Sequence, residues 1–192
     1  MTFFHDYAIL AVILLGITSL VLLAHFGWRW TLLALGVQYL AMAWLVSLSW
    51  PLPLAAIKLV VGWMAGAVLA TSQAGLQEPV ESLSGRLFRL LAAGLVLVAV
   101  YTVSSPVSDW LQVQQPILLG TFVLIAVGLV QISMTHHPLR VVVGLLTVLS
   151  GFEILYAALE LSVLVAGLLA VVNLGLALSG AYLLTTETRE TG

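Results

Sequence analysis

Glu153 is the residue whose type and position point most directly to chemistry, because it lies well inside the apolar run of residues 139–160. An ionised carboxylate in hydrocarbon is costly, so an intramembrane Glu normally faces a protein interior or water and marks a proton or ion path. Glu160 follows at a heptad step, which returns to within about 20° of the same helix face. Ser150 lies about one turn before Glu153. The spacing predicts a polar stripe of three ion-path candidates, Ser150, Glu153 and Glu160.

Lys58 is the one cation that falls well inside an apolar run of membrane length rather than at its end, at a depth of roughly 7 Å by the rise of an α-helix. Roughly 20 Å of helix separate Glu153 from Arg140, which places Glu153 in the same half of the bilayer as Lys58. Two interpretations stay open: Lys58 extends to the membrane surface, or it pairs with Glu153. Asn173, in the last apolar run, is expected to hydrogen-bond a neighbouring helix and is a further ion-path candidate.

His136, His137 and Arg140 stand at the other end of the Glu153 run. Histidine titrates near neutrality, so the three residues are candidates for proton entry from the cytoplasm, although a polar turn before Pro138 is the favoured explanation. The chain has no cysteine, nucleophile elbow, P-loop or metal-ligand spacing. We therefore expect no cofactor, no metal and no catalytic site in this chain.

The composition is that of an integral membrane protein. Of the 192 residues, 62% are hydrophobic and 7% are charged, whereas soluble domains carry roughly 25% charged residues. The few charges are scattered, so no basic patch exists for nucleic acid. Apolar runs of membrane length cover residues 7–24, 31–50, 54–71, 87–104, 116–134, 139–159 and 161–184.

The short segments between these runs predict antiparallel neighbours, and hence an all-α bundle of seven transmembrane helices. Residues 1–104 are expected to form a four-helix membrane segment, residues 105–184 a three-helix segment, and residues 185–192 a cytoplasmic tail. The arginines fall in the first, third or fifth loop, at the adjoining helix ends, or in the tail: Arg29, Arg86, Arg89, Arg140 and Arg189. Since cytoplasmic loops carry an excess of basic residues, the N-terminus is expected outside a cell (inner) membrane and the C-terminus in the cytoplasm.

The last three apolar runs resemble a known family. Their order, ISMTHHPLR, then VVVGLLTVLSGFEILYAAL, then VVNLGLALSGAYLL, is similar to the K subunit of respiratory complex I and to the C subunit of Mrp-type cation/proton antiporters. In those proteins a basic cytoplasmic turn precedes a helix with a Gly-x-Glu element, which Gly151-Phe152-Glu153 matches. The resemblance implies that Glu153 is a buried proton-channel glutamate.

Over its full length the chain resembles hydrogenase-4 component E, a seven-helix membrane subunit of formate-hydrogenlyase-like complexes. Lys58, in IKLVVGWM, matches the intramembrane lysine of that family. Two departures stand out. The second glutamate of the K subunit would fall near Val171 or Val172, which leaves Glu160 as its candidate substitute. The acidic position of component E falls at Leu149, so Glu153 follows the K-subunit pattern more closely.

Two functions follow from these observations. The favoured one is a non-redox, non-catalytic membrane subunit of a complex-I-like, hydrogenase-like or Mrp-like assembly that helps to conduct protons or Na⁺, with antiporter-like subunits as lateral partners. In the alternative, the chain is a scaffold of the same assembly, and Glu153 and Lys58 form a buried ion pair that fixes helix register. A stand-alone solute transporter is disfavoured because the sequence shows no inverted repeat of matched broken helices.

Overall fold

The computed structural model of the chain describes residues 7–24, 27–73 and 83–190, with side chains up to Thr186. Within these ranges all regular structure is helical. The helices are α2 (Ala8–Ala24), α3 (Trp28–Val46), α4 (Leu52–Gln73), α5 (Leu83–Leu111), α6 (Gln115–Ser133), α7 (Pro138–Leu159) and α8 (Val163–Glu190). The all-α class and the seven helices expected from the apolar runs are confirmed for the described part of the chain.

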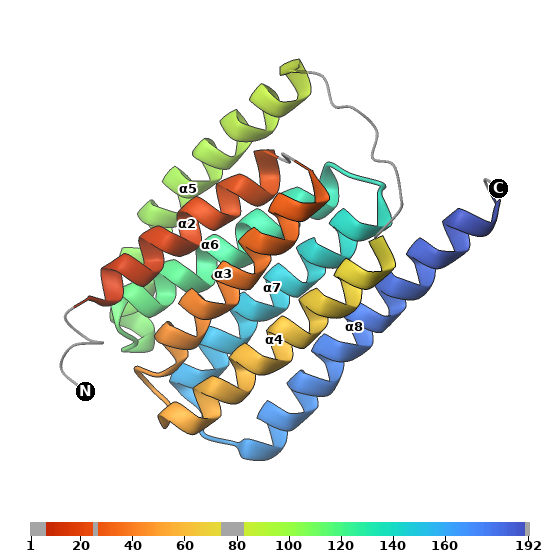
Figure 1. Cartoon of the computed structure of the whole chain (residues 1–192). Helices are drawn as coiled ribbons and strands as arrows, with labels where there is room; N and C mark the ends of the chain where they lie inside the picture. Colours follow the sequence, from red (N-terminus) through yellow and green to blue (C-terminus); the bar gives the residue numbers. More distant parts are fainter. Residues whose placement is uncertain (1–6, 25–26, 74–82, 191–192) are drawn as a thin grey trace.

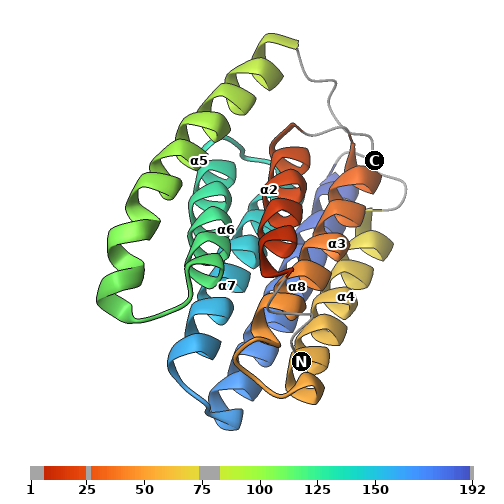
Figure 2. The same cartoon turned by 90° about the vertical axis from the view of Figure 1, so that its left-hand side faces the viewer.

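The helices run alongside one another as a bundle (Figure 1). α7 packs closely on α6, and α4 packs between α3 and α8. α5 is peripheral, since it contacts mainly α6 and α2 and stands at one edge of the bundle (Figure 2). Connections of three to five residues join α3 to α4 and link α5, α6, α7 and α8 in turn. The short loops therefore do produce antiparallel neighbours.

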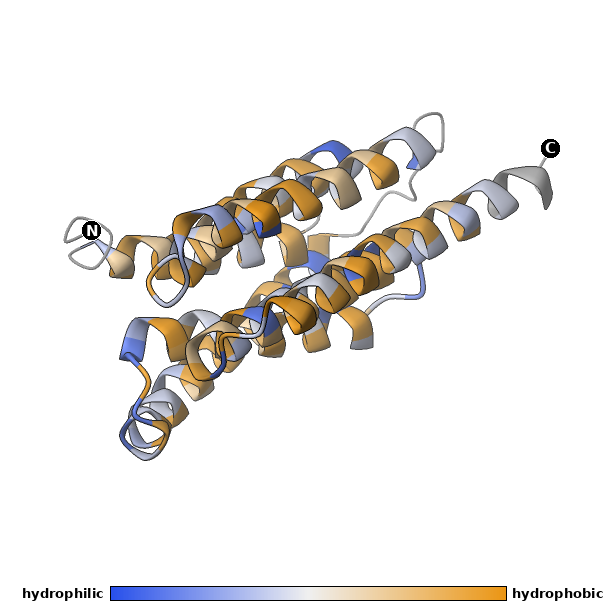
Figure 3. Ribbon diagram, turned by 90° about the horizontal axis from the view of Figure 1, so that it is seen from below, coloured by the Kyte–Doolittle hydropathy of each residue, from blue (hydrophilic) through white to orange (hydrophobic). Residues whose placement is uncertain are grey.

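Hydrophobic residues predominate along the lengths of the helices (Figure 3), and many of the large ones lie on the outer surface of the bundle. Leu33, Leu95 and Leu164 are 62%, 74% and 79% exposed, which is unfavourable in water but matches hydrocarbon. The helices α3 to α8 are each long and apolar enough to cross a membrane, and α2 is an apolar helix of 17 residues. These features indicate a multi-pass membrane protein.

α5 and α8 extend well beyond the C-terminal ends of the apolar runs that predicted them. α5 begins at Leu83 and continues through Pro106 to Leu111, because a proline is tolerated in a membrane helix where neighbouring groups satisfy the backbone. α8 continues to Glu190, so most of the expected tail is helical. A helix does not stop where hydropathy falls, since its backbone groups still need partners.

Glycines allow α6 and α7 to lie in direct contact. A Cβ atom added at Gly151 would lie 2.8 Å from the Thr121 carbonyl oxygen, and one added at Gly128 would lie 2.8 Å from the Gly144 carbonyl oxygen. No side chain fits at these distances, so the two backbones approach each other as in other small-residue membrane interfaces. Glu153, two residues after Gly151, projects from nearly the opposite side of α7, and so faces away from α6.

Gly62 has the corresponding role between α3 and α4. A Cβ atom at Gly62 would overlap the ring of Tyr39, which lies directly against the α4 backbone. Gly66, one turn later, has open space beside it. Gly62 and Gly66 form a GxxxG spacing in α4, and of the two only Gly62 makes a close contact within the described part of the chain.

We expect Gly62→Ala to destabilise the protein by about 1–3 kcal/mol, because overpacking would displace the Tyr39 ring. Gly66→Ala is the matched control, and it should be neutral or slightly stabilising since Ala favours a helix over Gly by up to about 1 kcal/mol. Thermal unfolding of both variants in the same detergent, followed by circular dichroism, provides the measurement. Equal midpoints for the two variants would contradict the close Tyr39 contact.

Candidate functional site

Three helices bring polar side chains to a common depth in the bundle. Lys58 lies roughly 9 Å from the start of α4, and Glu153 lies roughly 9 Å from the end of α7, at the same end of the bundle. Asn173 lies roughly 15 Å into α8, which begins at that end. Because helical side chains lean toward the N-terminus of their own helix, Glu153 leans inward and Asn173 leans back toward it. The opposite directions of α7 and α8 therefore make these side chains meet.

Lys58 and Glu153 form a buried ion pair. The Lys58 ammonium donates to Glu153 Oε1 at 2.7 Å and to the carbonyl oxygen of Ala166 in α8 at 3.2 Å. The two side chains are only 4% and 1% exposed. The sequence left two interpretations of Lys58 open. In the structure Lys58 pairs with Glu153 and does not extend to the membrane surface.

Asn173 and Tyr39 extend the pair into a network across four helices. Asn173 Nδ2 donates to Glu153 Oε1 at 3.1 Å, and the Tyr39 hydroxyl donates to Asn173 Oδ1 at 2.9 Å. All three side chains are buried. A carboxylate only accepts hydrogen bonds, so it fixes the amide orientation of Asn173 and leaves the amide oxygen to Tyr39. Ser150 lies beside the Tyr39 hydroxyl and donates to the carbonyl oxygen of Leu146 at 2.8 Å.

The second carboxylate oxygen of Glu153 is buried and has no hydrogen-bond partner among the described residues. An ionised carboxylate offers about four acceptor positions on its two oxygens, and here both protein donors act on Oε1. Oε2 can therefore accept a proton or a water. Protonation there would neutralise Glu153 and remove the charge that holds Lys58, so proton binding and the ion pair are directly opposed.

Buried polar groups continue from Glu153 toward the other end of α7. Gln38 Nε2 donates to Thr147 Oγ1 at 3.2 Å, and Thr147 in turn donates to the carbonyl oxygen of Val143 at 2.8 Å. Gln38 Oε1 is buried without a partner in the described part of the chain. Thr147, Ser150 and Glu153 follow one another at steps of roughly 4.5 Å along α7. These hydroxyl and amide groups can hydrogen-bond water, which would carry the proton between them.

Arg140 lies buried in the first turn of α7, with 7% exposure. Gln131 Nε2 donates to its carbonyl oxygen at 3.1 Å. Arg140, Gln131 and Arg89 line a cavity of about 10 Å³, about the space that one water needs. His137 precedes α7 and is half-buried, and His136 is exposed. Of the three residues predicted to admit protons, only Arg140 lines this small cavity, whose lining also includes Leu22, Leu23 and Met134.

The structure does not bring Glu160 to the ion pair. α7 ends at Leu159, and Glu160 has an extended backbone and an exposed side chain. Its carbonyl oxygen accepts a hydrogen bond from Trp50 Nε1 at 3.0 Å. The heptad spacing to Glu153 assumed a helix that continues through Glu160, so the predicted polar stripe stops at Glu153.

Tyr39 and the Ala166 carbonyl group are the members of the network that the sequence did not indicate. Tyr39 lies in an apolar run, where an aromatic residue suggests core packing. The available signal was its hydroxyl group, which needs a hydrogen-bond partner within a membrane. The sequence gives no sign of the carbonyl group, because every residue has one.

Comparisons of the chain with models of protein families, with curated proteins and with solved structures give no match. The resemblance carried by Gly151-Phe152-Glu153 and Lys58 therefore stays a prediction.

We expect Lys58→Met and Glu153→Gln each to destabilise the protein by about 3–5 kcal/mol, because either change leaves one buried charge without its partner. The double variant removes both charges and should recover much of that loss. Unfolding of the four proteins in one detergent gives a double-mutant cycle. If the double variant lost as much as the two single variants added together, the side chains would be energetically independent, contrary to the observed pair.

Proposed function

We propose that this chain is a non-redox membrane subunit that helps to translocate protons, and that Glu153 is the group that binds and releases the proton. The observation that carries the proposal is a buried carboxylate whose Oε1 accepts hydrogen bonds from Lys58 and Asn173 while its Oε2 has no partner among the described residues. Ionisable groups at such depth typically mark ion paths. A proton suits this site better than Na⁺, since the adjacent ammonium would repel a bound cation.

The proposed cycle has two states of Glu153. In the first, Glu153 is ionised and paired with Lys58, so the buried pair carries no net charge. In the second, a proton occupies Oε2, the attraction to Lys58 falls, and the ammonium is held by the Ala166 carbonyl oxygen and by any water that enters. Loss of the proton restores the pair. Asn173 and Tyr39 would keep the carboxyl group in place during both steps, because their hydrogen bonds come from other helices.

The polar groups along α7 support a path between Glu153 and the Arg140 end. Ser150, Thr147 and Gln38 cover the half of the route next to Glu153. Roughly 10 Å of α7 then separate Thr147 from Arg140. Water entering beside Gln38 Oε1, a buried acceptor, would have to bridge that interval during transport.

We further propose that this chain is one subunit of a larger membrane complex. The Gly151-Phe152-Glu153 motif and Lys58 support membership of a complex-I-like, hydrogenase-like or Mrp-like complex, with antiporter-like subunits beside this chain. Seven spans in the cell (inner) membrane, with the N-terminus outside and the C-terminus in the cytoplasm, fit the distribution of arginines. The exposed apolar faces of α5 and α8 are suited to lateral contacts with neighbouring helices.

The same network favours a second candidate, a scaffold without an ion path of its own. The ion pair and its hydrogen bonds join α4, α7, α8 and α3. Such a set of directional contacts fixes the register of four helices whatever their role in transport. In this case larger partners would carry the ions.

We expect Glu153→Gln to abolish proton translocation by the intact assembly in sealed vesicles, and Glu153→Asp to retain part of it, because only a carboxyl group can take up and release the proton. Rates are normalised to the amount of assembled complex. Glu160→Gln is the matched control: it removes a carboxylate at the exposed end of the same helix and should leave the rate unchanged.

Two other outcomes would decide against the path. Unchanged translocation per complex in Glu153→Gln, together with a smaller amount of complex, would identify a scaffold. Equal translocation by Glu153→Asp and Glu153→Gln would show that no proton is carried on this side chain.

A further inference from the structure

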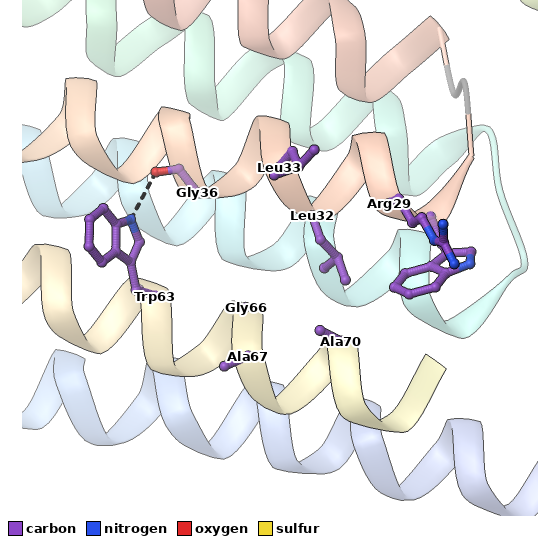
Figure 4. Close-up of a pocket in the computed structure, with 10 residues that line it drawn as sticks. Arg29, Leu32, Leu33, Gly36, Trp63, Gly66, Ala67 and Ala70 are labelled. Atoms are coloured by element: carbon purple, nitrogen blue, oxygen red, sulfur yellow. Dashed lines mark hydrogen bonds between the residues drawn. The ribbon is translucent and has the colours of Figure 1, made fainter. Parts of the chain in front are cut away.

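A groove runs along the outer surface between α3 and α4, apart from the ion-pair site (Figure 4). It has a volume of about 450 Å³. Gly66, Ala67 and Ala70 of α4 form one side, and their small side chains leave the space open. At the deep end Trp63 crosses to α3, where its Nε1 donates to the Gly36 carbonyl oxygen at 3.1 Å.

The groove extends through about half of the membrane. Its mouth is at Arg29, in the first turn of α3, and its deep end is at Trp63, roughly 15 Å before the end of α4 at Gln73. The hydrocarbon core of a bilayer is about 30 Å thick. The groove therefore spans one leaflet, from the level of the headgroups to the level of the chain ends.

The mouth of the groove carries a positive charge. Arg29 is exposed, and its guanidinium group lies over the Trp28 ring at 5.3 Å from the centroid. No carboxylate of the described residues lies within ion-pair distance of Arg29. The ion pair among these residues joins Lys58 to Glu153 instead. Apart from Arg29 and the tryptophan N–H groups, the side chains lining the groove are apolar.

We propose that this groove binds one anionic phospholipid, with an acyl chain between α3 and α4 and the phosphate on Arg29. A guanidinium group matches a phosphate in charge and hydrogen-bond geometry, and basic sites between membrane helices favour anionic headgroups. The groove ends at Trp63 after about one leaflet, which matches the length of an acyl chain better than a partner helix that crosses both leaflets.

Native mass spectrometry of the purified protein, titrated with phosphatidylglycerol or with phosphatidylcholine of the same acyl chains, tests the proposal. Both lipids carry a phosphate, but the choline cation of phosphatidylcholine offsets its attraction to Arg29, so we expect one phosphatidylglycerol to bind about ten-fold more tightly. Arg29→Gln should remove this preference. Ala67→Leu, which fills the groove, should weaken binding of both lipids about five-fold or more.

The matched control is Ala99→Leu. Ala99 is an exposed alanine in a second apolar groove, between α5 and α6, whose lining contains no basic residue. Ala99→Leu should leave the binding of phosphatidylglycerol unchanged. Ala70→Leu provides a second filling variant if Ala67→Leu does not fold.

Equal binding of the two lipids by the native protein would overturn the proposal. So would an effect of Arg29→Gln without any effect of the filling variants, because that result would indicate attraction to surface charge alone. If the purified protein instead kept one copy of another polypeptide bound over α3 and α4, with no lipid there, the groove would likewise be assigned to a partner helix.

Discussion

The cost of placing a charge in hydrocarbon is the constraint on which this structure depends. Neither Lys58 nor Glu153 is stable there alone, and the pair is tolerated because its charges cancel and donors from other helices share the carboxylate. The arrangement requires α4, α7 and α8 to keep one register. The short connection between α7 and α8 and the glycine contacts between α6 and α7 limit the shifts that would separate the pair.

Much of the fold and part of the site could be predicted from the sequence, because hydropathy and helix rise determine position along the membrane normal. They gave the seven helices and placed Lys58 and Glu153 at similar depth. They do not determine which helices are lateral neighbours, so the pairing of α4 with α8 and the role of Tyr39 required the structure. Glu160 was expected on the face of Glu153 because the heptad step was carried through residue 160, although the apolar run 139–159 ends before it, as α7 does.

A rigid network and a proton carrier need not be alternatives. A buried carboxylate whose two oxygens both accept hydrogen bonds would strongly resist protonation. A buried carboxyl group without hydrogen-bond donors or a nearby cation would instead remain protonated. Glu153 lies between these limits, since Oε1 receives two donors and Oε2 receives none among the described residues. Asn173 and Tyr39 hold the side chain in one position, so a change in protonation can act on the Lys58 contact without loss of the local fold.

The groove and the ion-pair network share one element, the α4 backbone around Gly62. Gly62 lines the groove on its outer side, and the Tyr39 ring presses against it from α3. Tyr39 is also the last member of the chain that leads through Asn173 to Glu153. An acyl chain between α3 and α4 would fill the space beside this contact and limit separation of the two helices. Gly62 is therefore the point at which the lining of the groove meets the side chain that ends the Glu153 network.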